Sequence, residues 1–362
     1  MSSASVPQPQ WQLKYKGTDI TANLIHMVTE VSFHDRVGGQ VSDIQITVQD
    51  VNNRWHTSTY PQPNDTISVY LGYAGAPLLY VGEFCIDEFE FRGPPFTMMI
   101  KGIEAWTTAK LRTAKSVNWK GMTFSQIAKT IASEYGYTAI VNADPNQPEV
   151  QWDNVVQSFQ DQGDMSFLSY LATQNNYVIQ VRPPQMIFSS RAVLEKAGYV
   201  GPIITPAHIK ATHGANFRWQ SSAELALDGA INYFFNPYTE EGITGQAKNA
   251  NPGATSNVLN YSRRFENNQQ ATVDAAAKLH QNNMWQFQGE LTLPGTTAWR
   301  TGQVVMLRGW GIFNGRWFIE EADHTLSARA GYATKLVIRS GGTAGNLSPE
   351  GLEAANPTYF TP

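Results

Sequence analysis

Residues 121–181 carry the patterns of two short amphipathic helices followed by a strand, and long blocks with β-strand alternation lie on both sides of them. Amphipathic helices repeat about every 3.6 residues and half-buried strands every 2 residues, so a change of period marks a change of element. This order predicts a mainly β fold in which an α/β insert interrupts two β barrels.

The first helix has signals at both ends. Thr123 and Gln126 fit a capping box, and Met122 with Ile127 fits a hydrophobic staple. Gly136 offers a left-handed stop. One buried stripe is predicted from the residues at helical spacing, which are Phe124, Ile127, Ala128, Ile131, Ala132 and Tyr135.

The second helix is expected to begin with Asp164 as its N-cap and to stop at Asn175-Asn176. Its apolar face is predicted to contain Met165, Leu168, Leu171 and Ala172. Residues 177–181 alternate and contain β-branched side chains, which indicates an outgoing strand.

The block from Trp11 to Lys115 has strand patterns throughout. Apolar Ile44, Ile46 and Val48 alternate with polar residues. The alternation slips by one residue at Asp87-Glu88, which predicts a β-bulge. Several such strands with turn residues between them, including the turn at 93–95, indicate a small closed barrel.

The later part of the chain is less regular. Short strand-like runs occur in 198–208 and 230–236, and 247–257 is predicted to be a mobile loop. Residues 269–283 are predicted to be helical, with Val273, Ala276, Ala277 and His280 on one side. Strands are expected at 304–307, 317–321 and 335–339, with Asn314-Gly315 as a two-residue hairpin turn.

The predicted domains follow from these patterns, and the two β blocks show no strict sequence repeat. They are a first β-barrel domain (1–115), an α/β insert (116–184), second-barrel strands with insertions and a mobile loop (185–268), a helix and the closing strands of the second barrel (269–340), and an extended tail (341–362).

Composition favours a subunit of an assembly. Charged residues make up 15% of the 362 residues and aromatic residues 12%, a balance typical of interface centres. The net charge of −4 argues against a nucleic-acid-binding surface over the whole molecule. Cys85 is the only cysteine, and residues 1–10 lack a secretory signal, so we expect folding in a reducing cytoplasm without stable membrane insertion.

A search for catalytic motifs leaves only weak candidates. His34-Asp35 is interpreted as a surface pair, and His208 and His213 as loop histidines at a spacing unsuited to a metal. Cys85 is expected to be buried and inert. Residues 309–315 resemble a dinucleotide fingerprint, but the strand that follows favours a hairpin.

Two larger groups have a structural interpretation beside a functional one. The acidic groups that could supply paired glycosidase carboxylates are Asp87, Glu88, Glu90, Glu320, Glu321 and Asp323, and strand-surface or interface contacts are preferred. A sugar-stacking platform could use Trp285, Trp299, Trp310 and Trp317, for which core or interface packing is preferred. No catalytic, cofactor-binding or metal-binding residue is assigned, and no cofactor is expected.

Several segments resemble the late-control-D family of baseplate hub proteins from contractile phage tails, which includes the hub part of type VI secretion spike proteins. They are 110–112, 119–123 with the helix to Gly136, 157–158 with 164–172, 289–295, 302–305, 314–317, 324–326 and 331–336. The resemblance is weakest in 185–261. Asn175-Asn176 stands where the family often has a glycine.

The resemblance implies two tail-tube-like barrels in each chain and a homotrimer that joins the sixfold tail tube to a threefold spike. It implies a structural, non-enzymatic virion protein that lines the DNA channel without binding DNA specifically. The implied partners are a tail tube or distal tube protein, baseplate wedge proteins, a tape measure protein and a spike. We expect the spike to be a separate chain, because no spike-like segment follows the last barrel.

Two alternatives stay open from the sequence. A tail-associated cell-wall hydrolase needs a carboxylate pair or metal site on a concave surface. A glycan- or receptor-binding tail protein would use these four tryptophans and would not trimerise.

Overall fold

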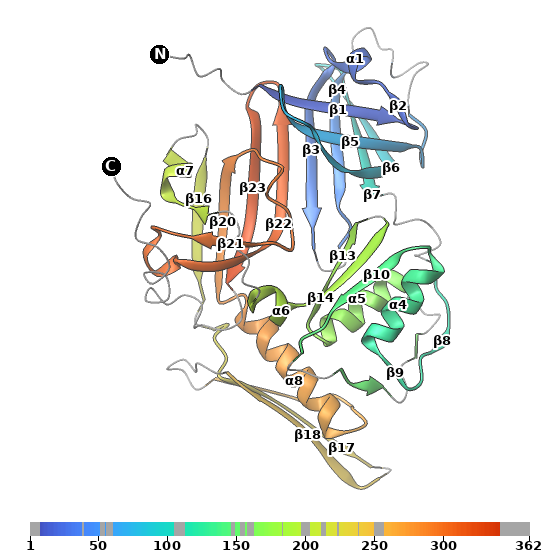
Figure 1. Ribbon diagram of the computed structural model, residues 1–362, viewed down its shortest axis with the longest axis vertical. Helices are drawn as coiled ribbons and strands as arrows, with labels where there is room; N and C mark the ends of the chain where they lie inside the picture. The colour runs from blue at the N-terminus through green and yellow to red at the C-terminus, as the bar shows by residue number, and fades with distance from the viewer. Residues whose placement is uncertain are drawn as a thin grey trace.

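The computed structural model describes residues 8–37, 40–50, 55, 61–104, 113–145, 149–152, 156–157, 163–182, 184–196, 203–210, 215–222, 224–237, 239–249 and 257–340. These residues form a mainly β protein with an α/β insert, which confirms the predicted fold class (Figure 1). The segment 110–112, His213, most of the predicted mobile loop and the tail lie outside the described residues.

The N-terminal block contributes strands to one large sheet. They are β1 (Pro9–Tyr15), β2 (Thr18–Asp19), β3 (Val28–Arg36), β4 (Asp43–Gln49), β5 (Thr66–Tyr73), β6 (Leu79–Arg92) and β7 (Thr97–Glu104), with the short helix α1 (Thr21–Leu24) after β2. Ile44, Ile46 and Val48 are buried, as predicted from the alternation. The register of β6 and β7 shifts between Ile86 and Glu88, which confirms the bulge at Asp87.

The C-terminal block adds a second set of strands to the same sheet. They are β15 (Ile203–Ile204), β16 (Asn216–Ser221), β20 (Phe287–Pro294), β21 (Val304–Leu307), β22 (Gly315–Ser327) and β23 (Gly331–Ser340), with α7 (Pro206–Lys210) between the first two. The predicted two-residue turn is wrong. Leu307 pairs with Gly315, so 308–314 form a longer loop that contains the 3-10 helix η2 (Gly311–Phe313).

The two blocks arrange their strands in the same order. The first has β3-β4-β7-β6-β5-β1, and the second has β16-β20-β23-β22-β21-β15. Equivalent strands also occur in the same order along the chain, although β15 and β21 pair in parallel where β1 and β5 are antiparallel. We call these two sets the first and second modules, and they join where β22 pairs with β3.

The pairing registers align the modules residue by residue. In the first module one row across four strands contains Phe33, Ile44, Gly102 and Ile86. In the second module the equivalent row contains Trp219, Gly289, Ile338 and Ile319. In both modules the row ends immediately before a bulged residue, which is Asp87 in β6 and Glu320 in β22.

Ring contacts support this alignment. The rings of Phe33 and Phe84 lie 5.8 Å apart, and those of Trp219 and Trp317 lie 5.3 Å apart. Phe84 and Trp317 each stand two residues before the end of the aligned row. The same cross-sheet aromatic contact therefore occurs once in each module.

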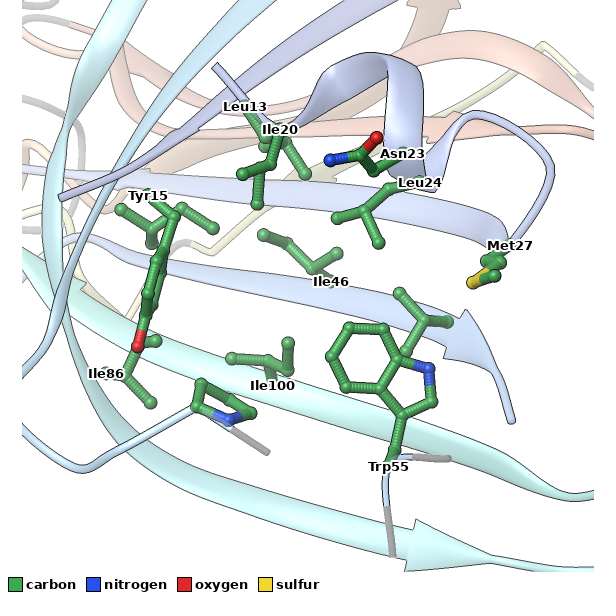
Figure 2. A pocket seen from close by; sticks show the side chains of 13 residues that line it. Leu13, Tyr15, Ile20, Asn23, Leu24, Met27, Ile46, Trp55, Ile86 and Ile100 are labelled. Carbon is green, nitrogen blue, oxygen red and sulfur yellow. The ribbon is translucent and has the colours of Figure 1, made fainter. Parts of the chain in front are cut away.

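The first module curls around an apolar interior. Side chains from β1, β4, β5, β6, β7 and α1 surround one cavity of about 580 Å³, and Figure 2 shows Leu13, Ile46, Ile86 and Ile100 around it. Among the described strands, the hydrogen-bonded pairs form an open path with no pairing between β1 and β3 to close a ring. The module is thus barrel-like in its packing, with an open sheet edge.

The α/β insert has its own sheet and core. Strands β10 (Thr138–Asn142), β14 (Gln185–Ser190) and β13 (Tyr177–Arg182) form the sheet, and β14 extends it beyond residue 184. Helices α4 (Phe124–Glu134) and α5 (Asp164–Gln174) supply most of the buried side chains of this core. The remaining elements are β8 (Val117–Asn118), β9 (Met122–Thr123), β11 (Gln151–Trp152), β12 (Val156–Gln157) and α6 (Arg191–Lys196).

The predicted signals of α4 are confirmed, and one signal of α5 is wrong. Thr123 and Gln126 form the capping box, and Gly136 has a φ of 75°. In α5 the N-cap is Gly163, and Asp164 is the first helical residue. The Asp164 carboxylate is fully buried, where it accepts hydrogen bonds from Tyr135 Oη at 2.6 Å and Gln157 Nε2 at 2.8 Å.

A separate three-stranded sheet with one helix projects from the rest of the chain (Figure 1). We call it the arm, and it contains β17 (Gly229–Asn236), β18 (Glu241–Lys248), β19 (Val258–Tyr261) and α8 (Asn268–Asn283). The predicted helix is confirmed, and of the four residues predicted to share one side Ala277 is buried, whereas Val273, Ala276 and His280 are half-buried. Ala271, Ala275 and Leu279 are buried because α8 lies directly against β18.

Candidate functional site

The junction between the two modules brings together half of the singled-out acidic and histidine residues. Glu321–Ser327 of β22 pair antiparallel with Glu30–Arg36 of β3, so His34 lies opposite Asp323 and Asp35 lies opposite Ala322. Figure 1 shows β22 and β3 side by side where the C-terminal and N-terminal blocks meet. This junction is the candidate functional site.

One face of the junction carries a solvent-accessible charge network. Arg36 donates to Asp323 Oδ1 at 2.6 Å and lies 3.7 Å from Glu321 Oε2. His34 Nδ1 lies 2.8 Å from Asp43 Oδ2, and this hydrogen bond raises the pKa of His34. These acids therefore act as partners of basic side chains across the pairing.

The opposite face is buried. Asp35 is 1% exposed, and its Oδ2 accepts from Arg300 Nε at 2.7 Å and from the Thr301 backbone N–H at 3.2 Å. Arg182 of the insert lies 3.6 Å away. Burial acts to raise the pKa of Asp35, but the charges of both arginines outweigh it and hold that pKa below its ordinary value. The interpretation of His34-Asp35 as a surface pair is wrong for Asp35, because strand alternation sends the two side chains to opposite faces.

A second buried pair lies at the bulge of β22. Glu320 is 7% exposed, and its Oε1 accepts from Arg339 Nε at 2.6 Å and from Arg191 of α6 at 3.3 Å. The bulge gives Glu320 a position outside the regular pairing of β22 with β23. Arg182 and Arg191 thus connect the insert to both modules through buried carboxylates.

His324 lies at the centre of the junction and was not recognised as a site residue from the sequence. Its Nε2 donates to the Trp299 carbonyl at 3.0 Å, and its Nδ1 lies 3.0 Å from Tyr332 Oη. Its ring stacks on Phe33 at 5.8 Å with an interplanar angle of 19°. Burial, with a smaller contribution from Arg300, lowers the pKa of His324 to about 4, so the ring is neutral at pH 7.

The remaining acidic candidates lie at the strand surface, two of them in ion pairs. Glu88 lies 2.9 Å from Lys101 Nζ, and Glu90 lies 2.8 Å from Arg92. Asp87 is exposed at the bulge. These contacts agree with the preferred interpretation as strand-surface residues.

The other candidates have local structural roles. His208 accepts from the Thr205 backbone N–H at 3.1 Å. Cys85 is half-buried instead of fully buried, and burial raises the pKa of its thiol. Among the described residues, no three His, Cys, Asp or Glu side chains are grouped as metal ligands would be. Likewise, no described helix has the length and hydropathy needed to cross a membrane.

The tryptophans pack as core and interface residues would. Trp299 and Trp317 are buried. Trp310 lies 5.2 Å from Trp219 and 5.0 Å from the exposed ring of Phe217, in a cluster at β16. Trp285 is half-buried.

Comparisons with known proteins agree with the fold and with the family of the resemblance. Over 180 residues the chain is 26% identical to a probable baseplate hub protein of Escherichia phage 186, covering 50% of this chain and 44% of that protein. The predicted resemblance to phage baseplate hub proteins is confirmed. The aligned part spans less than half the length of this hub protein. No family model matches the chain.

Solved structures show the same fold. A 43 kDa tail protein of prophage MuSo2 from Shewanella oneidensis has a TM-score of 0.66 at 15% identity, covering 92% of this chain and 99% of that one. A type VI secretion component of E. coli, described as structurally similar to T4 tail proteins, has a TM-score of 0.54 at 12% identity, covering 90% of this chain and 76% of that one. The fold shared with these proteins therefore extends over nearly all of the chain.

Proposed function

We propose that the chain is the hub subunit of a phage-tail baseplate and that it works as a homotrimer. The observation that carries this proposal is the repeated strand order of the two modules. Three copies of a two-module chain present six similar modules, whereas the insert and the arm each occur three times. Such a ring matches a sixfold tube on one side and a threefold spike on the other.

Further support comes from the apolar side chains at the surface. Exposed aromatic and aliphatic side chains occur on both modules and on the arm, including Tyr80, Phe96, Phe217, Tyr233 and Ile312. Such side chains are typical of surfaces that are covered in an assembly. The partners proposed are the tail tube or distal tube protein, a separate spike, wedge proteins and a tape measure protein.

The proposed ring encloses the channel through which DNA passes. A channel that passes DNA without holding it needs neutral or acidic walls, because basic walls would bind phosphates. The net charge of −4 and the pairing of Arg36, Arg182 and Arg300 with carboxylates agree with this requirement. The protein is proposed to be made in the host cytoplasm and then built into the virion.

The proposed role is structural and not enzymatic. Glu320 is held by two arginines, and Glu88 and Glu90 lie in exposed ion pairs, so these acids have binding partners within the chain. A zymogram on peptidoglycan tests this point. A cleared band that disappears in Glu320→Gln or Asp87→Asn would favour the hydrolase instead.

The mass of the purified protein in solution, followed by electron cryomicroscopy of the assembled tail, tests the proposal directly. We expect a trimer that forms a six-module ring around a channel. A monomer at every concentration, or a continuous basic channel wall, would contradict it.

A further inference from the structure

The junction between the modules occurs once in the chain, but each of its two strands has an equivalent strand in the other module. It is formed by β22 of the second module and β3 of the first. The equivalent of β22 in the first module is β6, and the equivalent of β3 in the second module is β16. A second junction of the same kind can therefore form between β6 and β16, and these strands lie at different ends of the sheet.

Strand β16 has the free edge that this pairing needs. It is the terminal strand of the sheet among the described strands, and its side chains are exposed except for Trp219, which is half-buried. The Ser222 N–H donates to the Gln286 carbonyl at 2.8 Å. Because hydrogen-bonded pairs alternate in an antiparallel ladder, Phe217, Trp219 and Ser221 direct their backbone N–H and C=O groups away from β20.

In β3, the equivalent residues direct their backbone groups toward the same edge as in β16. The Ala328 N–H donates to the Thr29 carbonyl at 3.0 Å, so Phe33 and Asp35 direct their backbone groups toward β22. Phe33 is the equivalent of Trp219, and Asp35 is the equivalent of Ser221, by the aligned registers. Strand β16 thus presents the backbone groups that β3 uses in the existing junction.

Strand β6 also matches its equivalent. Its pairing with β5 ends at Cys85, and after the bulge at Asp87 it continues to Arg92 beside β7. Strand β22 behaves alike, because its pairing with β21 ends at Phe318 and its part after the bulge receives β3. Glu88 and Arg92 are exposed in this part of β6.

We propose that β6 of one copy pairs antiparallel with β16 of a second copy of this chain, which rests on the proposed trimer. His324 stands five positions after Ile319 and lies opposite Phe33. Phe91 stands five positions after Ile86, so Phe91 lies opposite Trp219 of the neighbour. In the same register Glu90 lies opposite Gln220.

This contact is head-to-tail, so it does not form a twofold dimer, and it closes into a ring when three copies complete the rotation, as the proposed trimer requires. The aromatic pair of Phe91 and Trp219 replaces the stack of His324 on Phe33. In this register Arg92 lies opposite Arg218, and Glu90, the ion-pair partner of Arg92 at 2.8 Å, lies diagonal to Arg218, so its carboxylate stands next to both arginines. Ser221 stands where Asp35 stands in the existing junction, so the contact between copies buries no carboxylate at that position.

Disulfide cross-linking tests the register. Glu90→Cys combined with Gln220→Cys places two cysteines at a directly opposed pair, within the Cα separation that a disulfide allows. With oxidised glutathione as the electron acceptor, we expect a covalent ladder that ends at the trimer. Glu90→Cys with Asn216→Cys is the control, because its second cysteine lies about 13 Å further along the strand. The unsubstituted protein controls for Cys85.

A backbone substitution tests the hydrogen bonding. Ser221→Pro removes an N–H that points away from β20, so the fold is retained while the contact between copies is lost. We expect the concentration for half-assembly to rise roughly tenfold or more, the equivalent of one or two lost hydrogen bonds. Ser221→Ala keeps the N–H and should assemble as the unsubstituted protein does.

The outcomes separate this inference from the proposed function. A trimer that forms normally with Ser221→Pro, or that cross-links equally in both cysteine pairs, overturns the β6–β16 contact and leaves the trimer standing. A protein that stays monomeric without any substitution overturns both. Circular dichroism of each variant checks that a loss of assembly does not come from unfolding.

Discussion

Arg300 Nε donates a 2.7 Å hydrogen bond to the carboxylate of Asp35, and this contact joins residues that lie 265 positions apart. Asp35 belongs to β3 of the first module, whereas Arg300 precedes β21 of the second. Arg182 of the insert lies 3.6 Å from the same carboxylate. One buried acid therefore connects three parts of the chain.

Arg300→Met should destabilise the fold strongly. It leaves the buried Asp35 carboxylate with the Thr301 backbone N–H and the more distant Arg182, and breaking such a pair typically costs about 3–5 kcal/mol. We expect the free energy of unfolding, measured by urea denaturation, to fall by about 3 kcal/mol. Lys101→Met is the matched control, because its partner Glu88 is exposed, and it should cost less than about 1 kcal/mol. Equal effects of the two substitutions would contradict the role of the buried pair.

Acidification should weaken the fold between about pH 6.5 and pH 4. The pKa of His324 is lowered to about 4 in the folded protein, whereas an unfolded histidine titrates near 6.5. Between these values the unfolded chain binds a proton that the folded chain does not, so the free energy of unfolding falls as the pH drops. The expected loss is on the order of 3 kcal/mol. His34, whose pKa is raised, acts in the opposite direction but above about pH 6.5, where the folded chain still binds a proton that the unfolded chain has released.

His324→Gln isolates this contribution. Glutamine offers a donor for the Trp299 carbonyl and an acceptor for Tyr332, but it does not titrate. We expect urea denaturation curves of this variant to depend less on pH between 4 and 6.5. His208→Gln, at an exposed histidine, should keep the pH dependence of the unsubstituted protein. A pH profile unchanged by His324→Gln would show that another group governs it.

Thr123→Ala should destabilise the insert by about 1 kcal/mol, the usual effect of removing an N-cap side chain. Thr123 accepts from the Gln126 N–H at the start of α4. Thr130→Ala is the control on the same helix, because the Thr130 hydroxyl only bonds to the Gln126 carbonyl one turn earlier. Urea denaturation should show a clear loss for the first variant and almost none for the second.

Local features of the fold could be predicted because they depend on neighbours in the sequence. The capping box at Thr123, the left-handed Gly136 and the bulge at Asp87 each follow from residues within a few positions. The predictions are wrong where a contact with residues distant in the sequence determines the role of a side chain. Asp164 binds Tyr135 and Gln157 instead of capping α5, and a local pattern cannot show those partners.

The junction could be predicted only in its parts. His34, Asp35, Glu321 and Asp323 stand out in the sequence as acidic or histidine groups, but Arg36 and Asp323 meet from 287 positions apart. The module repeat is equally hidden, because aligned positions exchange large and small residues. Ile44 corresponds to Gly289, and Gly102 corresponds to Ile338, so the same volume is filled from a different strand.

Gly245→Ala should displace α8 from the arm. A Cβ at this position would lie 2.1 Å from the backbone carbonyl of Ala271, and backbone cannot move aside as a flexible side chain can. Overpacking typically costs about 1–3 kcal/mol, and a backbone clash should reach the upper end of that range. Gly242→Ala is the matched control on the same strand, because its nearest neighbour is the exposed ring of Tyr233 at 3.4 Å. Hydrogen exchange of α8 should increase only in the first variant, and similar protection in both would mean that α8 does not pack on Gly245.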